Sequence, residues 1–597
     1  MSSEKNRFGL SWPKDAGSRR DMLRSRLGCE GGLFGGFATV SGILSTRPEM
    51  IRELDRRIPG LVMITTKSYQ LAPNPGNREP VIVEASAGSF GNAVGLRNPG
   101  MGKAVEELIR LRSSWKMRAL LNVSLSGSSP EEFVRLAEGF SPVADTLELN
   151  FSCPHAAPGY GMSIGVEPEL VARYVRAIRE VTDLPLLPKL TPNTEDIGAV
   201  AEAAMRAGAD GLVAVNTFGP ELYIEKHSGK PILMNIHGGK GGKSGRWIHH
   251  EAVEKVRSIR EQIGTDPLII GMGGVEDAKG VTAMREAGAN VVGIGSAFAM
   301  VRPEDWEGWF EELALSEESE KAVRPAVPRI KRPQMVYRPY RISSARSGIG
   351  GLRRITLDGR VPFEAGQFVF LWIPGVGEKP FSVALSDPLT FLVRERGEMT
   401  RALCALEAGD TLYMRGMYGS GAKLPVTRRA WILAGGTGLA VVPTLASALV
   451  GRGSELSIFM ALSDREAAAG TKSEADTLFS KELSALGSYQ VVQDDGVIGR
   501  AVKVFAGELA AEGAAEEGAL YVIGPAPFME AAAAAGRAAG IPSDRISLSI
   551  ETPTRCGVGL CGECVCAGKL TCREGTFFTL AELEARGVKP GDFSDDH

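Results

Sequence analysis

The chain has 597 residues, which is enough for several domains with buried cores and excludes a small disulfide-stapled module. Its 68 Lys and Arg residues nearly balance 71 Asp and Glu residues, and the formal charge of −3 disfavours a nucleic-acid-binding surface. The amino terminus lacks the apolar segment of a secretory signal, so we expect a cytoplasmic protein.

Residues 31–316 alternate short apolar runs with amphipathic helical patterns, after an amino-terminal extension of residues 1–30. Eight runs rich in β-branched residues predict strands, at residues 36–40, 61–66, 119–125, 146–151, 184–190, 211–217, 267–271 and 290–295. Apolar residues at helical spacing predict helices between them, as at residues 130–139, 168–182, 194–207, 250–263 and 278–287. Eight such repeats predict an α/β fold, a (β/α)8 barrel. An open, doubly wound sheet is the alternative, because periodicity alone does not establish closure.

Amide and amine side chains follow several of these predicted strands. In a (β/α)8 barrel the carboxyl ends of the strands form the active-site face. A lysine there can stabilise the negative charge that develops on a reduced flavin, and asparagines offer a donor and an acceptor to a cyclic imide. The candidates at these strand ends are Lys67, Asn122, Asn150, Cys153, Lys189, Asn216 and Thr217.

Three glycine-rich loops follow in the same region, at residues 238–245, 271–275 and 293–297. The last two close the seventh and eighth predicted strands, where such barrels commonly bind a phosphate group. We therefore expect the phosphate of FMN to be held by Gly245, Gly273, Gly274, Gly295 and Ser296.

A charged, proline-containing stretch at residues 317–334 predicts a linker, and a different architecture follows it. Short strands separated by Gly, Pro and Asp predict a small antiparallel β-barrel over residues 335–427. Residues 428–545 return to βα alternation and predict an α/β nucleotide-binding domain. The uncharged run at residues 430–451 is long enough to span a membrane, but its glycines and proline favour a strand, a turn and a helix start. We therefore expect no membrane association.

Two glycine turns in the α/β region predict a dinucleotide site. LAGGTGLAVVP (433–443) reads as strand, turn and helix, which brings a pyrophosphate to free helix N–H groups, and YVIGPAPFM (521–529) ends another strand. Upstream, EKPFSVA (378–384) and RGEMTRAL (396–403) supply a cation, hydroxyls and turn amides. Together these runs resemble the ferredoxin-reductase-like modules that bind FAD and NAD. The resemblance implies FAD contacts at Lys379, Pro380, Phe381, Ser382, Gly397 and Thr400, and NAD contacts at Gly435, Gly436, Thr437, Gly438, Gly524 and Pro525.

The segment of residues 546–597 carries a cysteine cluster in which Cys556, Cys561, Cys564 and Cys572 are spaced C-x4-C-x2-C-x7-C. Plant-type 2Fe–2S sites use the x4 and x2 spacing with a fourth cysteine further along. A zinc site is the alternative, although zinc sites usually have two short-spaced pairs. Cys566 could replace Cys572 as the fourth ligand.

These motifs resemble class 1B dihydroorotate dehydrogenases, with a catalytic subunit over residues 35–315 and an electron-transfer subunit over residues 335–597. Specific motifs of the first part are TKSY (66–69), NAVGLRNPG (92–100), ELNFSCP (148–154), PKL (188–190) and VNT (215–217). The resemblance implies that Cys153 is the general base, that Lys67, Asn122, Asn150 and Lys189 contact FMN, and that the family's barrel-to-barrel homodimer forms. It also implies oxidation of dihydroorotate by NAD+ through FMN, 2Fe–2S and FAD.

The resemblance implies a substrate site formed by Lys67, Asn92, Val94, Gly95, Leu96, Asn150, His155, Asn216 and Thr217. Lys379 stands where the family has arginine, which keeps the charge and loses the bidentate fork. His155 stands where most members have asparagine, and SCPH also occurs in dihydropyrimidine dehydrogenases, so a neutral dihydropyrimidine is the alternative substrate. Two further hypotheses are a reductase with a degenerate barrel and a zinc-stabilised interaction segment.

Overall fold

The computed structural model describes residues 11–151, 162–315, 335–348, 351–463, 479–494, 500–512 and 517–590, together with Phe8. The chain divides into two units, each of which is described by itself. The first contains residues 1–332 and the short segment Val558–Glu563, and the second contains residues 333–557 and 564–597.

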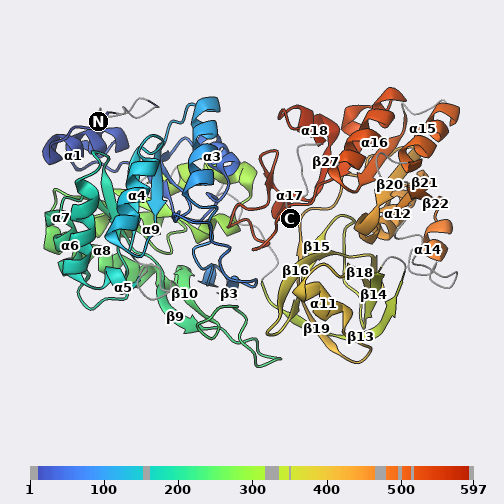
Figure 1. The fold of residues 1–597 in the computed structure, drawn as a ribbon, viewed down its shortest axis with the longest axis horizontal. Helices are drawn as coiled ribbons and strands as arrows, with labels where there is room; N and C mark the ends of the chain where they lie inside the picture. Colours follow the sequence, from blue (N-terminus) through green and yellow to red (C-terminus); the bar gives the residue numbers. More distant parts are fainter. Residues whose placement is uncertain are drawn as a thin grey trace. The chain divides into compact units, whose positions relative to one another are not determined.

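Eight parallel strands of the first unit close into a barrel in the order β1-β12-β11-β8-β7-β6-β5-β2 (Figure 1). This closure confirms the predicted (β/α)8 barrel and excludes the open sheet. Interior strands such as β5 are buried along their whole length, as expected for a parallel sheet covered by helices. The strands are β1 (Phe37–Thr39), β2 (Leu61–Thr65), β5 (Leu120–Leu125), β6 (Thr146–Asn150), β7 (Leu186–Lys189), β8 (Gly211–Ala214), β11 (Leu268–Met272) and β12 (Val291–Ile294).

Amphipathic helices connect these strands and lie around the barrel (Figure 1). In α4 the Ser129 side chain accepts the Glu132 N–H at the amino end, and Phe133, Leu136, Ala137 and Phe140 are buried. Burial of each large apolar side chain contributes about 1.5–3 kcal/mol. The helices are α2 (Pro48–Arg57), α3 (Met101–Ser114), α4 (Pro130–Phe140), α5 (Met162–Gly165), α6 (Pro168–Arg179), α7 (Ile197–Arg206), α8 (His249–Ile263), α9 (Ala278–Glu286) and α10 (Trp306–Ala314).

A four-stranded antiparallel sheet is added to the barrel in the order β3-β4-β10-β9. Its strands are β3 (Ile82–Ser86), β4 (Ser89–Asn92), β9 (Phe218–Leu222) and β10 (Lys240–Gly245). Asn92 pairs with Gly242 across β4 and β10, so the sheet brings a predicted substrate residue close to the first predicted phosphate loop.

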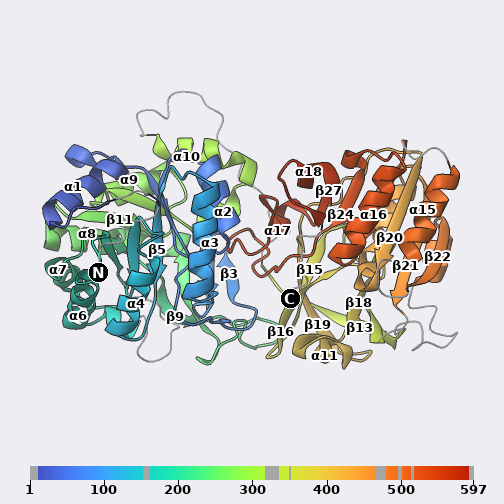
Figure 2. The same ribbon diagram turned by 45° about the horizontal axis from the view of Figure 1, so that its top comes forward.

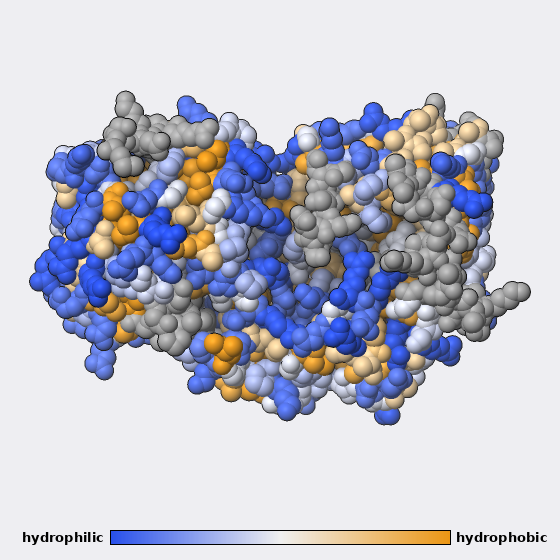
Figure 3. All heavy atoms as spheres, viewed as in Figure 1, coloured by the Kyte–Doolittle hydropathy of each residue, from blue (hydrophilic) through white to orange (hydrophobic). Residues whose placement is uncertain are grey.

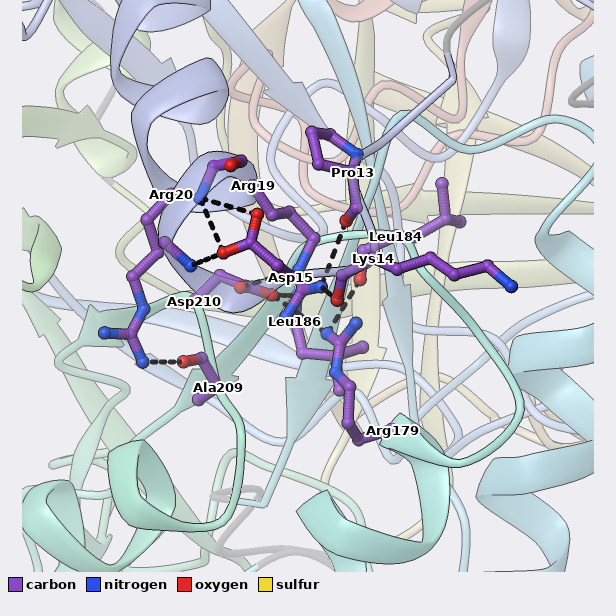
Figure 4. Close-up of polar contacts among 12 residues, drawn as sticks. Pro13, Lys14, Asp15, Arg19, Arg20, Arg179, Leu184, Leu186, Ala209 and Asp210 are labelled. Carbon is purple, nitrogen blue, oxygen red and sulfur yellow. Dashed lines mark hydrogen bonds and ion pairs between the residues drawn. The ribbon is translucent and has the colours of Figure 1, made fainter.

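Helix α1 (Ala16–Leu27) binds at the amino ends of β7 and β8 through a buried carboxylate (Figure 4). Asp210 accepts hydrogen bonds from Arg19 Nε at 2.7 Å, Arg179 Nη2 at 2.9 Å and the Leu186 N–H at 2.9 Å. Burial lowers the pKa of Arg179 to about 10, and it stays charged at neutral pH. The extension of residues 1–30, which had no predicted role, thus supplies one of two cations that neutralise Asp210.

We expect Asp210→Asn to destabilise the first unit by about 3–5 kcal/mol, because it leaves the buried guanidinium of Arg19 and the partly buried one of Arg179 without their counter-charge. The matched control is Asp266→Asn. Asp266 also binds α1, through Arg24 at 2.8 Å, but its side chain is 69% exposed, so its loss should cost under about 1 kcal/mol. Chemical unfolding followed by tryptophan fluorescence measures both, and equal losses would contradict this account.

The second unit begins with a seven-stranded antiparallel sheet in the order β16-β15-β19-β13-β14-β18-β17. Its antiparallel pairing agrees with the prediction for residues 335–427, and the strand order is that of a sheet with β16 and β17 at its two ends instead of a closed barrel. Val369 and Leu371 of β15 join one apolar core with Ile355, so the alternate residue Phe370 faces the other way. The elements are β13 (Arg338–Ser347), β14 (Leu352–Leu357), β15 (Phe368–Ile373), β16 (Gly377–Ser382), β17 (Leu385–Ser386), β18 (Leu389–Arg394), α11 (Glu398–Cys404) and β19 (Thr411–Tyr418).

The rest of the second unit is an α/β sheet in the order β22-β21-β20-β23-β24-β27. Trp431 and Leu433 of β20 pack with α15 and α16, whereas Ile432 and Ala434 pack with α12, so helices cover both faces (Figure 2). The elements are β20 (Arg429–Gly435), α12 (Val442–Val450), β21 (Glu455–Ser463), α14 (Ser480–Ser484), β22 (Ser488–Asp494), α15 (Arg500–Glu512), β23 (Ala519–Ile523), α16 (Ala526–Ala538), β24 (Ile546–Ser549), β27 (Phe577–Thr579) and α18 (Leu580–Glu584).

The uncharged run at residues 430–451 forms strand β20, a glycine turn and helix α12, as predicted. In the described part of the chain, no helix is both long and apolar enough to cross a membrane. On the face drawn in Figure 3, hydrophilic residues dominate and hydrophobic residues form scattered areas.

Candidate functional site

A buried polar network joins neighbouring barrel strands at the predicted active-site face. Its members are Ser68, Ser124, Glu148, Asn150 and Lys189, and each is at most 5% exposed. Lys189 Nζ lies 3.8 Å from Glu148 Oε1, which also accepts the Ser124 hydroxyl at 2.8 Å. Ser68 contacts Ser124 at 2.9 Å and accepts the Asn150 amide at 2.9 Å.

Asn150 and Lys189 stand opposite each other in the register of β6 and β7, so the structure brings these two predicted FMN residues together. Asn122 is also buried, but its amide is used within the barrel: it donates to Thr65 at 3.1 Å and accepts from Thr146 at 2.8 Å. Lys67 follows β2, and its Nζ lies 3.1 Å from the position that a Cβ would take on Gly42.

In the loop of Val94, Gly95 and Leu96, the carbonyl groups are hydrogen-bonded within the described part of the protein and the N–H groups are not. Asparagines take its carbonyl groups: the Asn77 N–H binds Val94 O at 3.0 Å, the Asn74 amide binds Gly95 O at 3.2 Å, and the Asn98 amide binds Leu96 O at 2.8 Å. Within the described ranges, the three N–H groups of this loop donate to no protein acceptor. They are therefore available to an acceptor group of a ligand, such as a carboxylate, in the substrate site that the resemblance implies.

The predicted phosphate residues converge although they come from three separate loops. A Cβ on Gly274 would lie 2.6 Å from Gly245 O, and a Cβ on Gly245 would lie 3.2 Å from Ser296 Oγ. Gly245, Gly273 and Gly274 all have positive φ, which favours glycine. Gly295 follows strand β12 and precedes Ser296, the first residue of a short 3₁₀ helix. The three loops thus approach one another through their main chains, an arrangement that suits a phosphate-binding site.

We expect Gly274→Ala to lose bound FMN, because the new methyl group would press on the Gly245 main chain. The matched control is Gly238→Ala, since Gly238 has the same φ of +68° but nothing within 4 Å of its would-be Cβ. Both variants carry the backbone strain of about 1–2 kcal/mol, and only the first closes the cradle. Flavin released per protein after gel filtration measures the difference, and equal FMN retention would contradict the assignment.

Two important predicted residues, Cys153 and His155, lie outside the described residues. Asn216 and Thr217 follow β8, where the Asn216 side chain accepts the Thr217 N–H at 2.8 Å. Asn92 ends β4 and donates its amide to Gly242 O at 3.4 Å.

The two predicted NAD loops follow neighbouring parallel strands, β20 and β23. Gly435 ends β20, and Gly436, Thr437 and Gly438 begin the short 3₁₀ helix that leads to α12. A Cβ on Gly438 would lie 3.0 Å from Ile523 O, so the first loop approaches the end of β23 closely. Gly524 and Pro525 follow β23, and Pro525 caps α16. Both loops therefore meet at the carboxyl edge of the sheet, where open α/β sheets bind ligands.

The predicted FAD residues occupy β16 and the start of α11. Lys379, Pro380, Phe381 and Ser382 lie on β16, and the Lys379 side chain is exposed. Thr400 Oγ1 accepts the N–H groups of Arg396 at 2.8 Å and Gly397 at 2.9 Å, so it caps its own helix.

Three of the four predicted cluster ligands meet in the second unit. Hydrogen bonds with Cys556 and Cys564, followed by burial, raise the pKa of the Cys572 thiol well above its usual value. Cys566 instead lies in an apolar core with Phe578 and Ile550, which favours Cys572 as the fourth ligand. Cys561 belongs to the first unit, where its carbonyl accepts the Thr46 hydroxyl at 2.7 Å.

The meeting of three buried thiols fits the donor set of a 2Fe–2S cluster. No group of three or more His, Cys, Asp and Glu residues arranged to hold a metal ion is found in the described part of the chain. The cluster assignment therefore rests on cysteine spacing and on these thiol contacts.

Besides the Arg19–Asp210 pair of helix α1, two buried ion pairs near predicted site residues were not foreseen from the sequence. Glu148, although part of a quoted motif, received no role, and it is the partner of Lys189. Glu378 and Arg415 form a second pair in the second unit, with both side chains fully buried. A charged residue inside an otherwise apolar strand, as in TLYMRG, was the available signal.

A closed (β/α)8 barrel with a buried lysine and a buried asparagine at the carboxyl ends of neighbouring strands has the architecture of a barrel enzyme, whose active site lies at that face. The family model for dihydroorotate dehydrogenase matches residues 34–313. A relative from Methanothermobacter thermautotrophicus is 39% identical over 265 residues, covering 44% of this chain and 84% of its own length. Those from Pyrococcus abyssi and Geobacillus kaustophilus are 40% and 36% identical over 258 and 260 residues, which are 43% of this chain in each case and 82% and 79% of the relatives.

All three relatives are named dihydroorotate dehydrogenase B (NAD(+)), catalytic subunit. The chain belongs to the dihydroorotate dehydrogenase family. Among solved structures, an NADH-dependent reduced ferredoxin–NADP oxidoreductase aligns with 41% of this chain and 88% of its own at 20% identity. Its TM-score of 0.35 is too low to support an assignment.

Proposed function

We propose that this chain oxidises (S)-dihydroorotate to orotate in pyrimidine biosynthesis, with NAD+ as the electron acceptor. The observation that carries the proposal is the 39% identity across 84% of a relative named for this activity. The free N–H groups of Val94, Gly95 and Leu96 support it, because dihydroorotate carries a carboxylate and neutral dihydropyrimidines do not.

In this proposal, different residues of the barrel bind the substrate, remove its proton and stabilise the charge that develops. The loop N–H groups bind the substrate carboxylate, and the amides of Asn92, Asn150 and Asn216 bind the imide edge. Cys153 removes a proton from C5, and bound FMN supplies the hydride acceptor for C6. Lys189 holds a positive charge next to the place where negative charge develops. Its pairing with Glu148 fixes the position of that charge inside the barrel.

The second unit would carry the electrons onward, from the 2Fe–2S cluster through FAD to NAD+. Three observations support this assignment: the meeting of Cys556, Cys564 and Cys572, the converging β20 and β23 loops, and the antiparallel sheet beside them in sequence. The domain ranges given above, a cytoplasmic location and a homodimer through the barrel are part of the same proposal.

The test is anaerobic purification with quantification of FMN, FAD, iron and sulfide, followed by NAD+ reduction with dihydroorotate and with dihydrouracil. We expect both flavins, iron with sulfide, and a preference for dihydroorotate. A preference for dihydrouracil would refute the substrate, and a single flavin type would refute the electron route.

A further inference from the structure

A buried arginine in the second unit faces an acid on one side and the cysteine segment on the other. Arg415 of β19 binds Glu378 of β16 in a bidentate pair, with Nη2 to Oε1 at 2.7 Å and Nε to Oε2 at 2.8 Å. Tyr337 donates to the same carboxylate at 2.5 Å. The guanidinium carbon lies 4.0 Å from the centre of the Phe370 ring, between the two strands.

The remaining N–H groups of Arg415 point to the residues around the first predicted cluster ligand. Nη1 donates to Cys556 O at 3.1 Å and to Tyr418 Oη at 2.7 Å, and Nη2 donates to Arg555 O at 3.3 Å. A guanidinium has five N–H groups, and here each has an acceptor. A single side chain thus fixes the main chain at Cys556 against a rigid sheet.

The same strand end also holds a second predicted ligand. The Gly419 N–H, one residue beyond β19, donates to Cys572 O at 3.0 Å. A Cβ on Gly557 would lie 3.0 Å from the rings of Phe370 and Tyr418, so the residue after Cys556 packs against the aromatic groups that surround Arg415. Two ligands whose side chains touch are therefore anchored through their main chains to one strand.

The Arg415–Glu378 ion pair is oriented with its positive charge toward the cysteine segment. Arg415 and Glu378 are both fully buried, and their two contacts of 2.7 and 2.8 Å bring the opposite charges together. The pair is neutral overall, and its positive end faces the cysteines. Reduction adds one negative charge to an iron–sulfur cluster, and nearby positive charge and hydrogen bonding favour that form.

We propose that Arg415, fixed by Glu378, is a positioning residue for the iron–sulfur site, which holds Cys556 in place and raises the reduction potential of the cluster. This inference rests on the proposed function only in requiring that the cysteines bind a cluster. An ion pair that merely stabilised the sheet would affect unfolding and leave the potential unchanged.

The experiment uses the full chain, purified anaerobically, in four forms: wild type, Tyr337→Phe, Arg415→Lys, and the double variant Glu378→Gln/Arg415→Gln. The double variant removes both charges together, which avoids an unpaired buried ion. Tyr337→Phe is the matched control, because it removes a hydrogen bond of the same buried cluster without touching the cysteine segment. Iron, sulfide and FAD per protein are measured first, and a redox titration followed by electron paramagnetic resonance gives the midpoint potential.

We expect the control to keep the wild-type potential and Arg415→Lys to shift it to more negative values, because lysine has three N–H groups for five acceptors. The double variant should shift it furthest, or lose iron while retaining FAD. Unchanged potentials at full iron content would overturn the inference, as would parallel loss of iron and FAD. Absence of iron and sulfide from the wild type would instead refute the proposed function, so the two failures are distinguishable.

Discussion

Cys153→Ala is expected to lower the rate of dihydroorotate oxidation by about 10²–10⁴-fold, the contribution of a positioned general base. Binding of both flavins should persist, because the alanine removes only the proton acceptor. NADH-driven reduction of an artificial dye should also persist, since that reaction would use the second unit alone. Stopped-flow reduction of FMN by dihydroorotate measures the affected step directly.

A matched control for this variant is Cys29→Ala. Cys29 is also a thiol of the first unit, but it is buried at 2% exposure, and burial raises its pKa to about 11. A thiol in that environment is inert, so its loss should leave turnover unchanged. Normal dihydroorotate turnover in Cys153→Ala would show that another group is the base.

Lys189→Met is expected to have the second largest effect. It should lower both the rate of FMN reduction and the free energy of unfolding. It leaves the Glu148 carboxylate buried with the Ser124 hydroxyl, and an unpaired buried charge costs about 3–5 kcal/mol. It also removes the cation beside the expected flavin, and losing one such electrostatic contact lowers kcat by about 10²–10³-fold. Thermal unfolding and FMN reduction rates measure the two losses separately.

The double variant Lys189→Met/Glu148→Gln separates these effects. Because glutamine can still accept the Ser124 hydroxyl and carries no charge, most of the stability should return. The reduction rate of FMN should stay low, since the cation is still absent. Recovery of the rate together with the stability would show that Lys189 acts only through the fold.

The barrel could be predicted from the sequence, and so could the polar residues at the ends of its strands. Both depend on local features: the periodicity of apolar residues and the place where each strand ends. Asn150 and Lys189 close two predicted strands, and parallel strands place their carboxyl ends at one edge. Gly274 and Ser296 follow the barrel strands β11 and β12, so the same rule brings them together. Gly245 ends β10 of the antiparallel sheet, and its approach to them depends on how that sheet is added to the barrel.

The ion pairs were not predictable, because they depend on which strands become neighbours. Glu378 and Arg415 are 37 residues apart and lie on strands that β15 separates. The fourth cluster ligand is similar: Cys566 and Cys572 are both within reach in sequence, and only packing places Cys566 in an apolar core. Strands β24 and β27 also extend the α/β sheet into the cysteine segment, which strand spacing did not indicate.

Helix α1 bears on how the chain can be trimmed for expression or crystallisation. A version starting after Leu27 would retain every proposed ligand-binding residue. It would, however, remove Arg19, the partner of Asp210, and the buried side chains of Leu23 and Leu27. Pro13 and Lys14 also receive hydrogen bonds from Arg19, and Trp12 is only 7% exposed. Affinity tags therefore belong upstream of Trp12. If a truncated protein precipitates, we would attribute this to the lost contacts of helix α1 and not to a defect in the flavin site.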